Sequence, residues 1–545
     1  MEITIKNSTA RALKEVLKDK ITFSYGVTPI LRQKQLFDLN VTLTDNSEDY
    51  LKKVLVVLEE EKETSAKKIK EVLNILKNVE NKNVRRLEQF IPAFEKFILE
   101  TKTQPWFFSI VKDHNSVAYC LLDIDLIHGR DSVFIRINLG YNNFGDFKTR
   151  SIHIDNTDLS TPIATILLNK GLCLETESML EDYAKYKLKF ENTLLLDKQQ
   201  FLVRKEANQV GTGNWWDNTY SSSRDLTVKG KPSKAILDVS KFKDNLRDTF
   251  YSNFFEKDIE VPSHPVLPFF SLIHHSSFWV NIINCKNYVY EENVKEKLVL
   301  PESHSQLIDA LVANLDVLKL ESEVETKSRI IRAKASSSII ICSGPPGTGK
   351  TLTAEVYAES IKKPLYEVNS GQLGEDAETI ETNLTKCLNR AIHFGIPMLI
   401  NEADTFIQSR GDSLAQNAVV SVFLRLLEYH NGLVFLTTNR SNIDDAILSR
   451  AIAEIKYTHL ETTDIRKRVW RSTVEEFNRE LSEKDLNLCA QNFVKITGRD
   501  ILNVVRLTSR VCEANGEKFN YESLVKNSVF KGLTVSKDLK TQAVN

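Results

Sequence analysis

The sequence contains no uninterrupted apolar run of the roughly 18–20 residues that a membrane-spanning helix requires. Its first residues show no basic segment followed by an apolar core, so no secretory signal is predicted. The seven cysteines include no Cys-x-x-Cys pair, and their spacing indicates no zinc site. We therefore expect no membrane partner and a cytoplasmic or other reducing compartment, in which thiols serve as small apolar side chains.

The chain also lacks an excess of charge of either sign. It has 72 lysines and arginines against 73 aspartates and glutamates, and its formal net charge is −1. Proteins that bind nucleic acid usually carry a basic surface that biases these totals. The balance argues against a nucleic-acid partner, although a local basic patch is compatible with it. A length of 545 residues predicts two to four domains.

The first half of the chain changes pattern near residue 100. Residues 1–100 are predicted to be mainly helical, because apolar residues between 48 and 76 recur at helical spacing. Residues 101–260 predict an α+β domain with a hairpin (117–126 and 132–137), a strand at 151–155 and a helix at 176–190. Glycine and serine are frequent at 208–233, which predicts a linker-like loop.

Two features of this half have alternative interpretations. Trp215 and Trp216 either hold the predicted loop against the protein or anchor a partner. Polar residues of the α+β region form either a metal or nuclease site or ordinary solvent-facing positions of strands and turns, and the second explains them at least as well. These residues are Asp123, Asp125, Asp131 and His153.

A phosphate-binding loop is the clearest motif of the second half. Residues 338–343 are an apolar run that predicts a buried parallel strand, and a helix is predicted at 352–361. Between them lies Gly-x-x-x-x-Gly-Lys-Thr, whose glycines let main-chain N–H groups face phosphates at a helix N-terminus. Lys350 is expected to reach the β- and γ-phosphates and Thr351 to ligate Mg²⁺. The predicted nucleotide contacts are Gly344, Pro345, Pro346, Gly347, Thr348, Gly349, Lys350, Thr351, Leu352 and, from farther along the chain, Arg499.

Polar side chains follow two further apolar runs. Residues 397–400 predict a strand that ends at Asn401 and Glu402, and Glu402 fits the carboxylate that activates water beside the γ-phosphate. Residues 433–438 predict another strand ending at Asn439, whose amide can orient that water. Arg450 follows, where an arginine can stabilise the γ-phosphoryl group of a neighbouring subunit. The predicted catalytic residues are therefore Lys350, Glu402, Asn439 and Arg450.

Together these motifs resemble the AAA+ superfamily, and more narrowly AAA-domain ATPases, many of them uncharacterised and fungal, with a long N-terminal region. The resemblance covers roughly residues 262–530. Its motifs are Lys297-Leu298-Val299-Leu300-Pro301, Gly344 to Thr351 with Leu352-Thr353-Ala354-Glu355, Pro364-Leu365-Tyr366, residues 422–429, Leu436-Thr437-Thr438-Asn439-Arg440 and Leu448-Ser449-Arg450.

The resemblance implies an α/β fold, the αβα sandwich of P-loop NTPases with a five-stranded parallel sheet and a small four-helix lid. It places the large subdomain with its lead-in at 261–460 and the lid and tail at 461–545, after the α+β N-terminal region. It implies ATP with Mg²⁺ as cofactors, bound between subunits of a ring that is usually hexameric. By position, Asn439 matches the first sensor, Arg450 the arginine finger and Arg499 the second sensor.

The sequence departs from the family pattern at three places. Asn401 replaces the metal-side acid, so that Mg²⁺ contact through water loses a full charge and slow turnover is expected. Residues 369–376 lack the aromatic residue with which threading motors grip a polypeptide, and only Leu373 could substitute weakly. Arg450 is followed by Ala451, Ile452 and Ala453, so a single arginine finger is available.

Three functions follow from these observations. The leading one is an ATPase that remodels a partner protein selected by residues 1–260. The second is a nucleotide-gated assembly or scaffold protein with little hydrolysis, which Asn401 favours. The third, and weakest, is an ATPase that drives a nucleic-acid-acting N-terminal module.

Overall fold

The computed structural model describes most of the chain, and it divides into two units, Met1–Tyr288 and Val289–Asn545. The described residues are 2–17, 21–23, 39–43, 48–63, 65–77, 84–101, 106–109, 118–129, 132–159, 161–204, 206–209, 224–226, 231–241, 246–292, 294, 306–307, 310, 338–410, 413–428, 430, 432–533 and 535.

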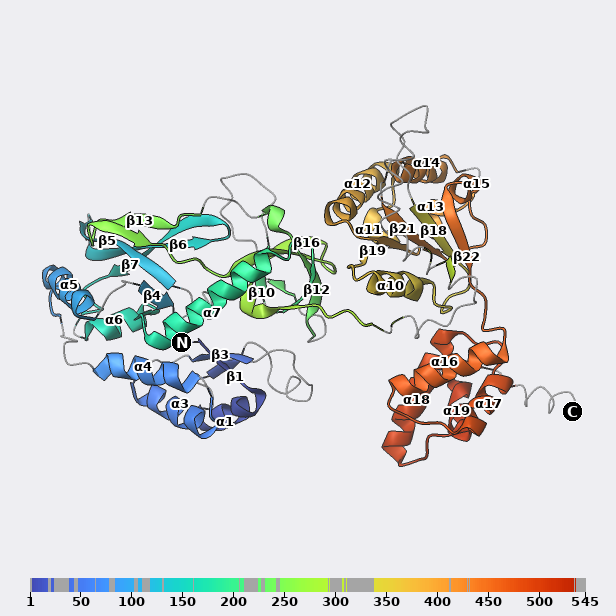
Figure 1. Ribbon diagram of the computed structural model, residues 1–545, viewed down its shortest axis with the longest axis horizontal. Coiled ribbons are helices and arrows are strands. Elements are labelled where there is room, and N and C mark those ends of the chain that lie inside the picture. The colour runs from blue at the N-terminus through green and yellow to red at the C-terminus, as the bar shows by residue number, and fades with distance from the viewer. Residues whose placement is uncertain are drawn as a thin grey trace, which may run out of the picture. The chain divides into compact units, whose positions relative to one another are not determined.

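The first unit begins with helices packed beside a small antiparallel sheet of order β1-β3-β2. Helix α3 forms because its apolar residues recur three and four positions apart, and Leu51, Val54 and Leu58 are fully buried. The elements, coloured blue in Figure 1, are β1 (Glu2–Ile5), α1 (Asn7–Leu17), β2 (Ile21–Phe23), β3 (Leu39–Leu43), α3 (Glu48–Glu60), α4 (Ser65–Lys77), η2 (Leu87–Gln89) and α5 (Phe90–Thr101).

An antiparallel five-stranded sheet of order β7-β6-β5-β4-β8 follows. Its long hairpin of β5 and β6 confirms the hairpin predicted from alternating apolar residues, and Ile124 pairs with Ile137 in the register. The elements are β4 (Trp106–Ser109), β5 (Ala118–His128), β6 (Val133–Asn143), β7 (Asp146–Ile154), α6 (Ile163–Asn169), β8 (Leu172–Leu174) and α7 (Glu177–Leu194).

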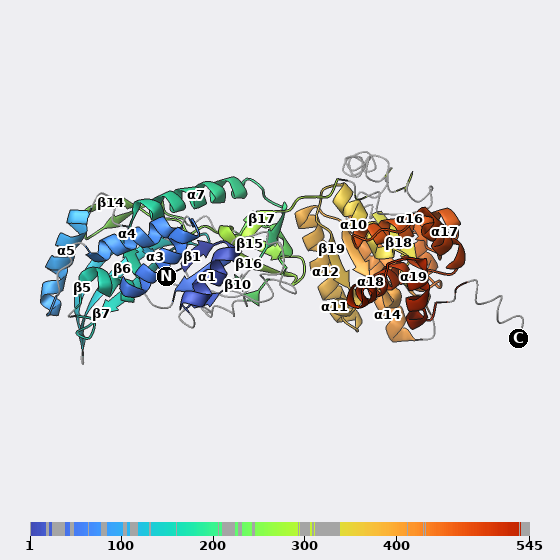
Figure 2. The same cartoon turned by 90° about the horizontal axis from the view of Figure 1, so that it is seen from below.

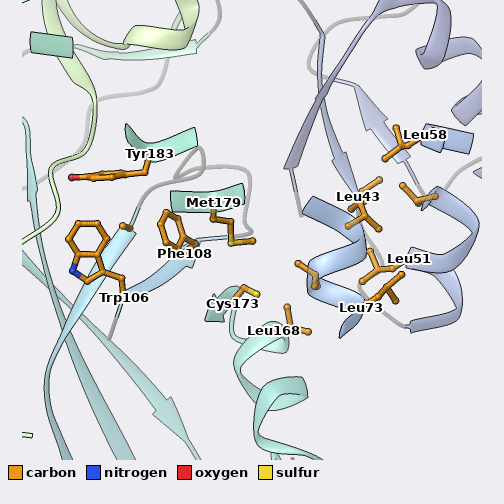
Figure 3. Close-up of a cluster of buried hydrophobic side chains, with 14 of the residues drawn as sticks. Leu43, Leu51, Leu58, Leu73, Trp106, Phe108, Leu168, Cys173, Met179 and Tyr183 are labelled. Atoms are coloured by element: carbon orange, nitrogen blue, oxygen red, sulfur yellow. The ribbon is translucent and has the colours of Figure 1, made fainter. Parts of the chain in front are cut away.

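One buried cluster joins the N-terminal helices to this sheet (Figure 3). Trp106 of β4 packs edge-on against Tyr183 of α7, with ring centroids 5.0 Å apart. Leu51 of α3 and Leu73 of α4 belong to the same cluster. Because these side chains are buried together, the first hundred residues and the α+β region stabilise each other.

A second antiparallel sheet completes the first unit, with strand order β11-β10-β16-β15-β12-β9-β17. Its core includes Phe201, Phe269 and Phe278, all with no more than 1% of their surface exposed. The elements are β9 (Gln200–Val203), β10 (Glu206–Gln209), β11 (Arg224–Asp225), β12 (Ser233–Leu237), η4 (Val239–Lys241), β15 (Val266–Ser271), β16 (Ser276–Asn281), η5 (Ile282–Asn284) and β17 (Cys285–Asn287), with a separate hairpin of β13 (Thr249–Ser252) and β14 (Lys257–Glu260).

The second unit contains the predicted five-stranded parallel sheet, with strand order β19-β20-β21-β18-β22. Its central strands are largely apolar, as suits a sheet that helices cover on both faces, and every residue of β21 is buried. Helix α10 packs against one face, whereas α12 and α14 pack together on the other (Figure 1). The elements are β18 (Ser338–Ser343), α10 (Lys350–Ser360), β19 (Tyr366–Asn369), α11 (Ser370–Leu373), α12 (Ala377–Phe394), β20 (Met398–Asn401), α13 (Asp404–Ile407), α14 (Leu414–Glu428), β21 (Leu433–Thr438), α15 (Asp445–Leu448) and β22 (Ala451–Lys456).

Helices α16 to α19 form a C-terminal part (Figure 2), and its own core includes Trp470, Phe493 and Ile501. Each helix begins with a side chain that accepts a hydrogen bond from a main-chain N–H of the first turn, which defines its start. The elements are α16 (Thr463–Glu476), α17 (Glu483–Asn492), α18 (Gly498–Asn515), α19 (Tyr521–Ser528) and the short η7 (Val529–Lys531). The predicted helical lid is confirmed.

His430, just before β21, is buried without a hydrogen-bond partner for either ring nitrogen among the described residues. This burial lowers the pKa of His430 from 6.5 to about 4. Between these values the unfolded chain binds a proton that the folded chain does not, so the free energy of unfolding falls as pH drops from 6.5 toward 4. The expected loss across this window is about 3 kcal/mol.

A His430→Phe variant tests this prediction, because it keeps an aromatic ring and removes the titrating group. Urea unfolding at pH 7 and pH 4.5 is expected to show a smaller pH-dependent loss in the variant than in the wild type. Equal losses in the two proteins would contradict the role of His430.

Within the described residues, no helix is both long and apolar enough to cross a membrane. All seven cysteines are buried and none forms a disulfide. Burial raises the pKa of the Cys342 thiol to about 12, so this group is neutral and packs as an apolar side chain. The interpretation of the cysteines as small core residues agrees with this burial.

Candidate functional site

The phosphate loop joins β18 to α10, and three of its glycines have positive φ angles. These are Gly344 (141°), Gly347 (81°) and Gly349 (103°), a region that residues with a Cβ rarely adopt. A Cβ at Gly344 would lie 2.2 Å from the main-chain oxygen of Tyr457, whereas one at Gly349 would meet nothing within 4 Å. Since Gly349 has no side chain to cap α10, it offers no side-chain acceptor to the first N–H groups of that helix, and such groups are the donors that bind anions.

Lys350 extends its ammonium group into this loop. Its Nζ donates hydrogen bonds to the main-chain oxygens of Gly344 and Pro345, each at 2.7 Å, and to Asn439 Oδ1 at 2.9 Å. Burial lowers the pKa of Lys350, and the nearby Arg499 charge lowers it further. The lysine is thus held where the β- and γ-phosphates of a nucleotide would lie on the loop.

Thr351 and Asn401 meet at the ends of α10 and β20. Thr351 Oγ1 donates to Asn401 Oδ1 at 3.2 Å, and Thr437 Oγ1 donates to the same oxygen at 2.6 Å. The Asn401 Nδ2 group donates to Glu367 Oε1 at 3.1 Å. The hydroxyl and amide oxygens therefore lie together, and both are ligand types that suit Mg²⁺, directly or through water.

Glu402 follows Asn401 in a left-handed backbone conformation with φ of 56°. This conformation is uncommon for a residue with a side chain, and such strain occurs often at functional sites. Glu402 N donates to Thr437 Oγ1 at 3.1 Å, which holds the turn against the neighbouring strand. The turn leaves the Glu402 side chain exposed at the carboxyl end of the sheet.

Asp404 is a positioning residue that the sequence did not single out. Its Oδ1 accepts hydrogen bonds from Asn439 N at 3.0 Å and from the hydroxyl of Thr438. Because the Lys350 ammonium can only donate, the Asn439 amide presents Oδ1 to it, and Nδ2 becomes the end that can donate to a phosphate or a water. Asp404 thus holds the residue predicted to orient water.

Arg499 reaches the phosphate loop from the first turn of α18. Its main-chain N donates to the oxygen of Gly347 at 3.1 Å. A Cβ at Gly347 would lie only 2.7 Å from Arg499 Cβ, so this glycine permits the close approach of the two segments. Arg499 therefore lies beside the loop of its own chain, where it was predicted to contact the nucleotide.

Arg450 is not joined to this group. Its Nη1 donates to the main-chain oxygen of Ala446 at 2.8 Å, and its Nη2 lies 3.5 Å from Glu428 Oε2. In the described part of the chain, its hydrogen bonds and ion pair therefore go to α15 and α14. An arginine that acts on a neighbouring subunit need not contact its own loop, so its predicted role stays a prediction.

Tyr457 connects the sheet to the helical lid. Its N donates to Ser343 O at 2.7 Å, and its hydroxyl hydrogen-bonds that of Thr353 on α10. Leu460 N donates to Ile496 O at 3.2 Å, inside the lid. Tyr457, which is hydrogen-bonded to the sheet, and Leu460, which is hydrogen-bonded to the lid, are thus separated by only two residues along the chain.

The residues present fit a magnesium nucleotide. Open space lies above Gly349, an ammonium group lies inside the loop, and two oxygen ligands converge at Thr351 and Asn401. Thr351 would ligate the metal directly, and Asn401 would do so through water. The residues brought together are Lys350, Thr351, Asn401, Asn439 and Arg499.

The described residues of the first unit give no support to the alternative metal or nuclease site. No group of three or more histidine, cysteine, aspartate or glutamate side chains is arranged to hold a metal in the described residues. Asp131 lies outside those residues. The other candidates form cross-strand pairs, which are Asp123 with Asn138, Asp125 with Arg136, and His153 with Phe134.

The structure tests one of two further sequence interpretations. Leu373, considered a weak gripping residue, is fully buried in α11 and cannot hold a polypeptide at the surface; its burial corrects that interpretation. Trp215 and Trp216 lie outside the described residues, so both interpretations of that pair stay predictions.

The fold and the loop define a P-loop nucleotide-binding protein. The family model described as "ATPase family associated with various cellular activities (AAA)" matches residues 340–458. The chain thus carries an AAA family ATPase domain of the AAA+ superfamily, with an additional N-terminal region.

Several curated proteins are similar to parts of the chain. An uncharacterised AAA family ATPase of Sinorhizobium fredii, y4kL, is 32% identical over 132 residues, which cover 22% of this chain and 38% of that protein. The ATP-dependent zinc metalloprotease FtsH of Parabacteroides distasonis is 26% identical over 199 residues, which cover 34% and 29%. The chain therefore spans between 29% and 38% of the length of these relatives.

Among solved structures, a chain of the E. coli MS115-1 HORMA:CdnC:Trip13 complex is 18% identical with a TM-score of 0.35. The match covers 44% of this chain and 92% of that chain. A TM-score this low describes partial overlap, and it adds nothing to the assignment.

Proposed function

We propose that this protein is an ATPase that binds Mg²⁺-ATP between subunits of a ring and uses it to remodel a partner protein. The observation that carries the proposal is that Lys350 of the phosphate loop bonds to Asn439, which Asp404 holds in place, beside the contact of Thr351 with Asn401. The FtsH relatives are ATP-dependent by name, which supports the use of ATP. Since the AAA part accounts for the nucleotide, we assign partner selection to the first unit.

Each residue has one task in the proposed reaction. The loop amides and Lys350 hold the phosphates, and Asn439 orients water through Nδ2. Glu402 accepts a proton from that water as its oxygen attacks the γ-phosphorus, and the bond from the γ-phosphorus to the β,γ-bridging oxygen breaks with ADP as the leaving group. Arg450 of a neighbouring subunit stabilises the charge that develops on the γ-phosphoryl oxygens. Thr351, and Asn401 through water, would hold a magnesium ion, which would supply positive charge beside the β- and γ-phosphates.

A second candidate is a nucleotide-gated assembly protein that hydrolyses ATP rarely. The observation that favours it is the neutral Asn401 amide at the place of a metal-side acid, which weakens the local negative charge. In this function, ATP binding drives assembly of the ring, and the assembled ring, not ATP hydrolysis, performs the biological task.

Turnover and assembly measured on the same full-length preparation separate the two functions. Steady-state phosphate release and sedimentation are recorded with ATP, with ADP and without nucleotide. Turnover well above that of a Glu402→Gln control supports the remodelling ATPase. ATP-dependent assembly with turnover no greater than that control supports the assembly protein. Absence of both turnover above the control and ATP-dependent assembly would overturn both candidates.

A further inference from the structure

Glu367 lies beside Asn401 at the carboxyl end of the sheet. Strands β19 and β20 are parallel neighbours, with Glu367 opposite Leu399 and Asn369 opposite Asn401. Because side chains two residues apart share a face, Glu367, Leu399 and Asn401 all point to the face that α10 covers. Glu367 is half-buried there, and its Oε1 accepts a hydrogen bond of 3.1 Å from Asn401 Nδ2.

This contact decides which end of the Asn401 amide faces the nucleotide. An ionised carboxylate only accepts hydrogen bonds, so the amide must turn Nδ2 toward Glu367. The oxygen Oδ1 is then directed to the hydroxyls of Thr351 and Thr437, at 3.2 and 2.6 Å. The reversed amide would place two oxygens against each other and an N–H₂ group at the metal side. Glu367 therefore fixes the orientation in which Asn401 can accept from a metal-bound water.

The same contact returns a negative charge to this part of the site. The other nearby carboxylates have different places: Asp404 Oδ1 accepts from Asn439 N and from Thr438, and Glu402 is exposed on the turn after β20. Glu367 is the carboxylate that is bonded to Asn401, and one amide group separates it from Thr351. A charge at that distance still acts on a divalent ion in a partly buried site.

We propose that Glu367 is a positioning residue of the magnesium site, which orients the Asn401 amide toward Thr351 and supplies the carboxylate charge that position 401 lacks. The inference rests on the proposed function, since it assumes that the loop binds a magnesium nucleotide. The carboxylate on the metal side of the site therefore comes from Glu367 on β19 and not from the end of β20. Asn401 links this carboxylate to Thr351 through its two hydrogen bonds.

This arrangement has a consequence for Asn401→Asp. A carboxylate introduced at position 401 would face Glu367 at hydrogen-bonding distance, and two such groups cannot both be fully ionised without repulsion. The substitution alone is expected to strengthen magnesium binding little. The double variant Glu367→Gln/Asn401→Asp has the amide at position 367 and the carboxylate at position 401. It is expected to recover the magnesium affinity that Glu367→Gln alone loses.

Magnesium dependence of nucleotide binding tests the inference without requiring hydrolysis. The full-length protein is titrated with a fluorescent β,γ-imido analogue of ATP, first in EDTA and then at increasing Mg²⁺. Glu367→Gln is expected to raise the Mg²⁺ concentration for half-maximal tightening about tenfold, the usual effect of removing an outer-shell partner. Its affinity for the analogue in EDTA is expected to match that of the wild type, which a general structural defect would not allow.

A matched control is Glu454→Gln on β22. Its carboxylate also accepts a hydrogen bond near the end of a strand, from Ser343 Oγ at 2.8 Å, but it does not bond to Asn401. This variant is expected to keep the wild-type Mg²⁺ half-point. The Glu367→Gln/Asn401→Asp variant is expected to return to the wild-type half-point or below it.

The outcomes separate the inference from the proposed function. A Glu367→Gln half-point equal to that of the wild type overturns the role of Glu367 and leaves nucleotide binding intact. A wild type that binds the analogue equally well with and without Mg²⁺ overturns the role of Glu367 and also the part that the proposed function gives to magnesium. Failure of the wild type to bind the analogue at all overturns the proposed function, and the role of Glu367 with it. An Asn401→Asp variant whose Mg²⁺ half-point falls about tenfold or more below that of the wild type would also contradict the inference.

Discussion

The Glu402→Gln protein is expected to bind ATP as the wild type does and to hydrolyse it about a hundredfold to ten-thousandfold more slowly. A general base contributes this much, and glutamine keeps the size of the side chain without accepting the proton. Binding should persist because the loop glycines, Lys350 and Thr351 are unchanged. Phosphate release and equilibrium binding of labelled ATP measure the two effects separately.

The control for this prediction is Glu476→Gln, which neutralises an exposed carboxylate of α16 far along the chain from the loop. It is expected to leave both turnover and binding unchanged. Glu402→Gln turnover within threefold of the wild type would show that another group accepts the proton. Loss of binding in the same variant would place Glu402 in nucleotide retention instead of catalysis.

The Arg450→Ala protein is expected to lose about a thousandfold or more of its turnover in the assembled ring. An arginine that neutralises charge in phosphoryl transfer contributes on that scale. The expected loss is large because the next residues, Ala451, Ile452 and Ala453, offer no second guanidinium. Arg471→Ala is the control, since this arginine is exposed and also pairs with a glutamate, Glu483.

Mixing the two inactive proteins tests whether Arg450 acts across subunits. A Glu402→Gln subunit has an intact Arg450, and an Arg450→Ala subunit has an intact Glu402. In a mixed ring, some sites then combine both groups, so turnover is expected to reappear and to peak near equal amounts. No recovery in rings shown by sedimentation to be mixed would indicate that Arg450 acts within its own chain, through Ala446 and Glu428.

The parallel sheet was predictable because its signals are local and strong. Residues 339–342 and 433–436 form apolar runs, which are typical of strands buried on both faces, and the loop pattern fixes the helix that follows the first. The small strands at the start of the chain were not predicted. Strands β1 and β2 contain four and three residues, too few to show an alternating pattern among helical neighbours.

The site shows the same limit. Lys350 and Thr351 follow from contiguous residues, and Asn439 and Arg499 from order along the chain. The bond between Glu367 and Asn401 spans 34 positions and depends on which strands are neighbours and in what register. Glu367 by itself looks like any polar residue that alternates with buried ones in a short strand. The role of Asp404 likewise depends on β20 lying beside β21.

The attachment of the lid limits how it can turn. Tyr457 is bonded to Ser343 and Thr353 and moves with the sheet, whereas Leu460 is bonded to Ile496 and moves with the lid. A rotation between them must therefore take place in the backbone of Thr458 and His459. The single main-chain bond between Arg499 and Gly347 crosses this two-residue hinge. An outward rotation of the lid about these two residues would stretch that bond, so the position of the lid and the conformation of the phosphate loop are coupled.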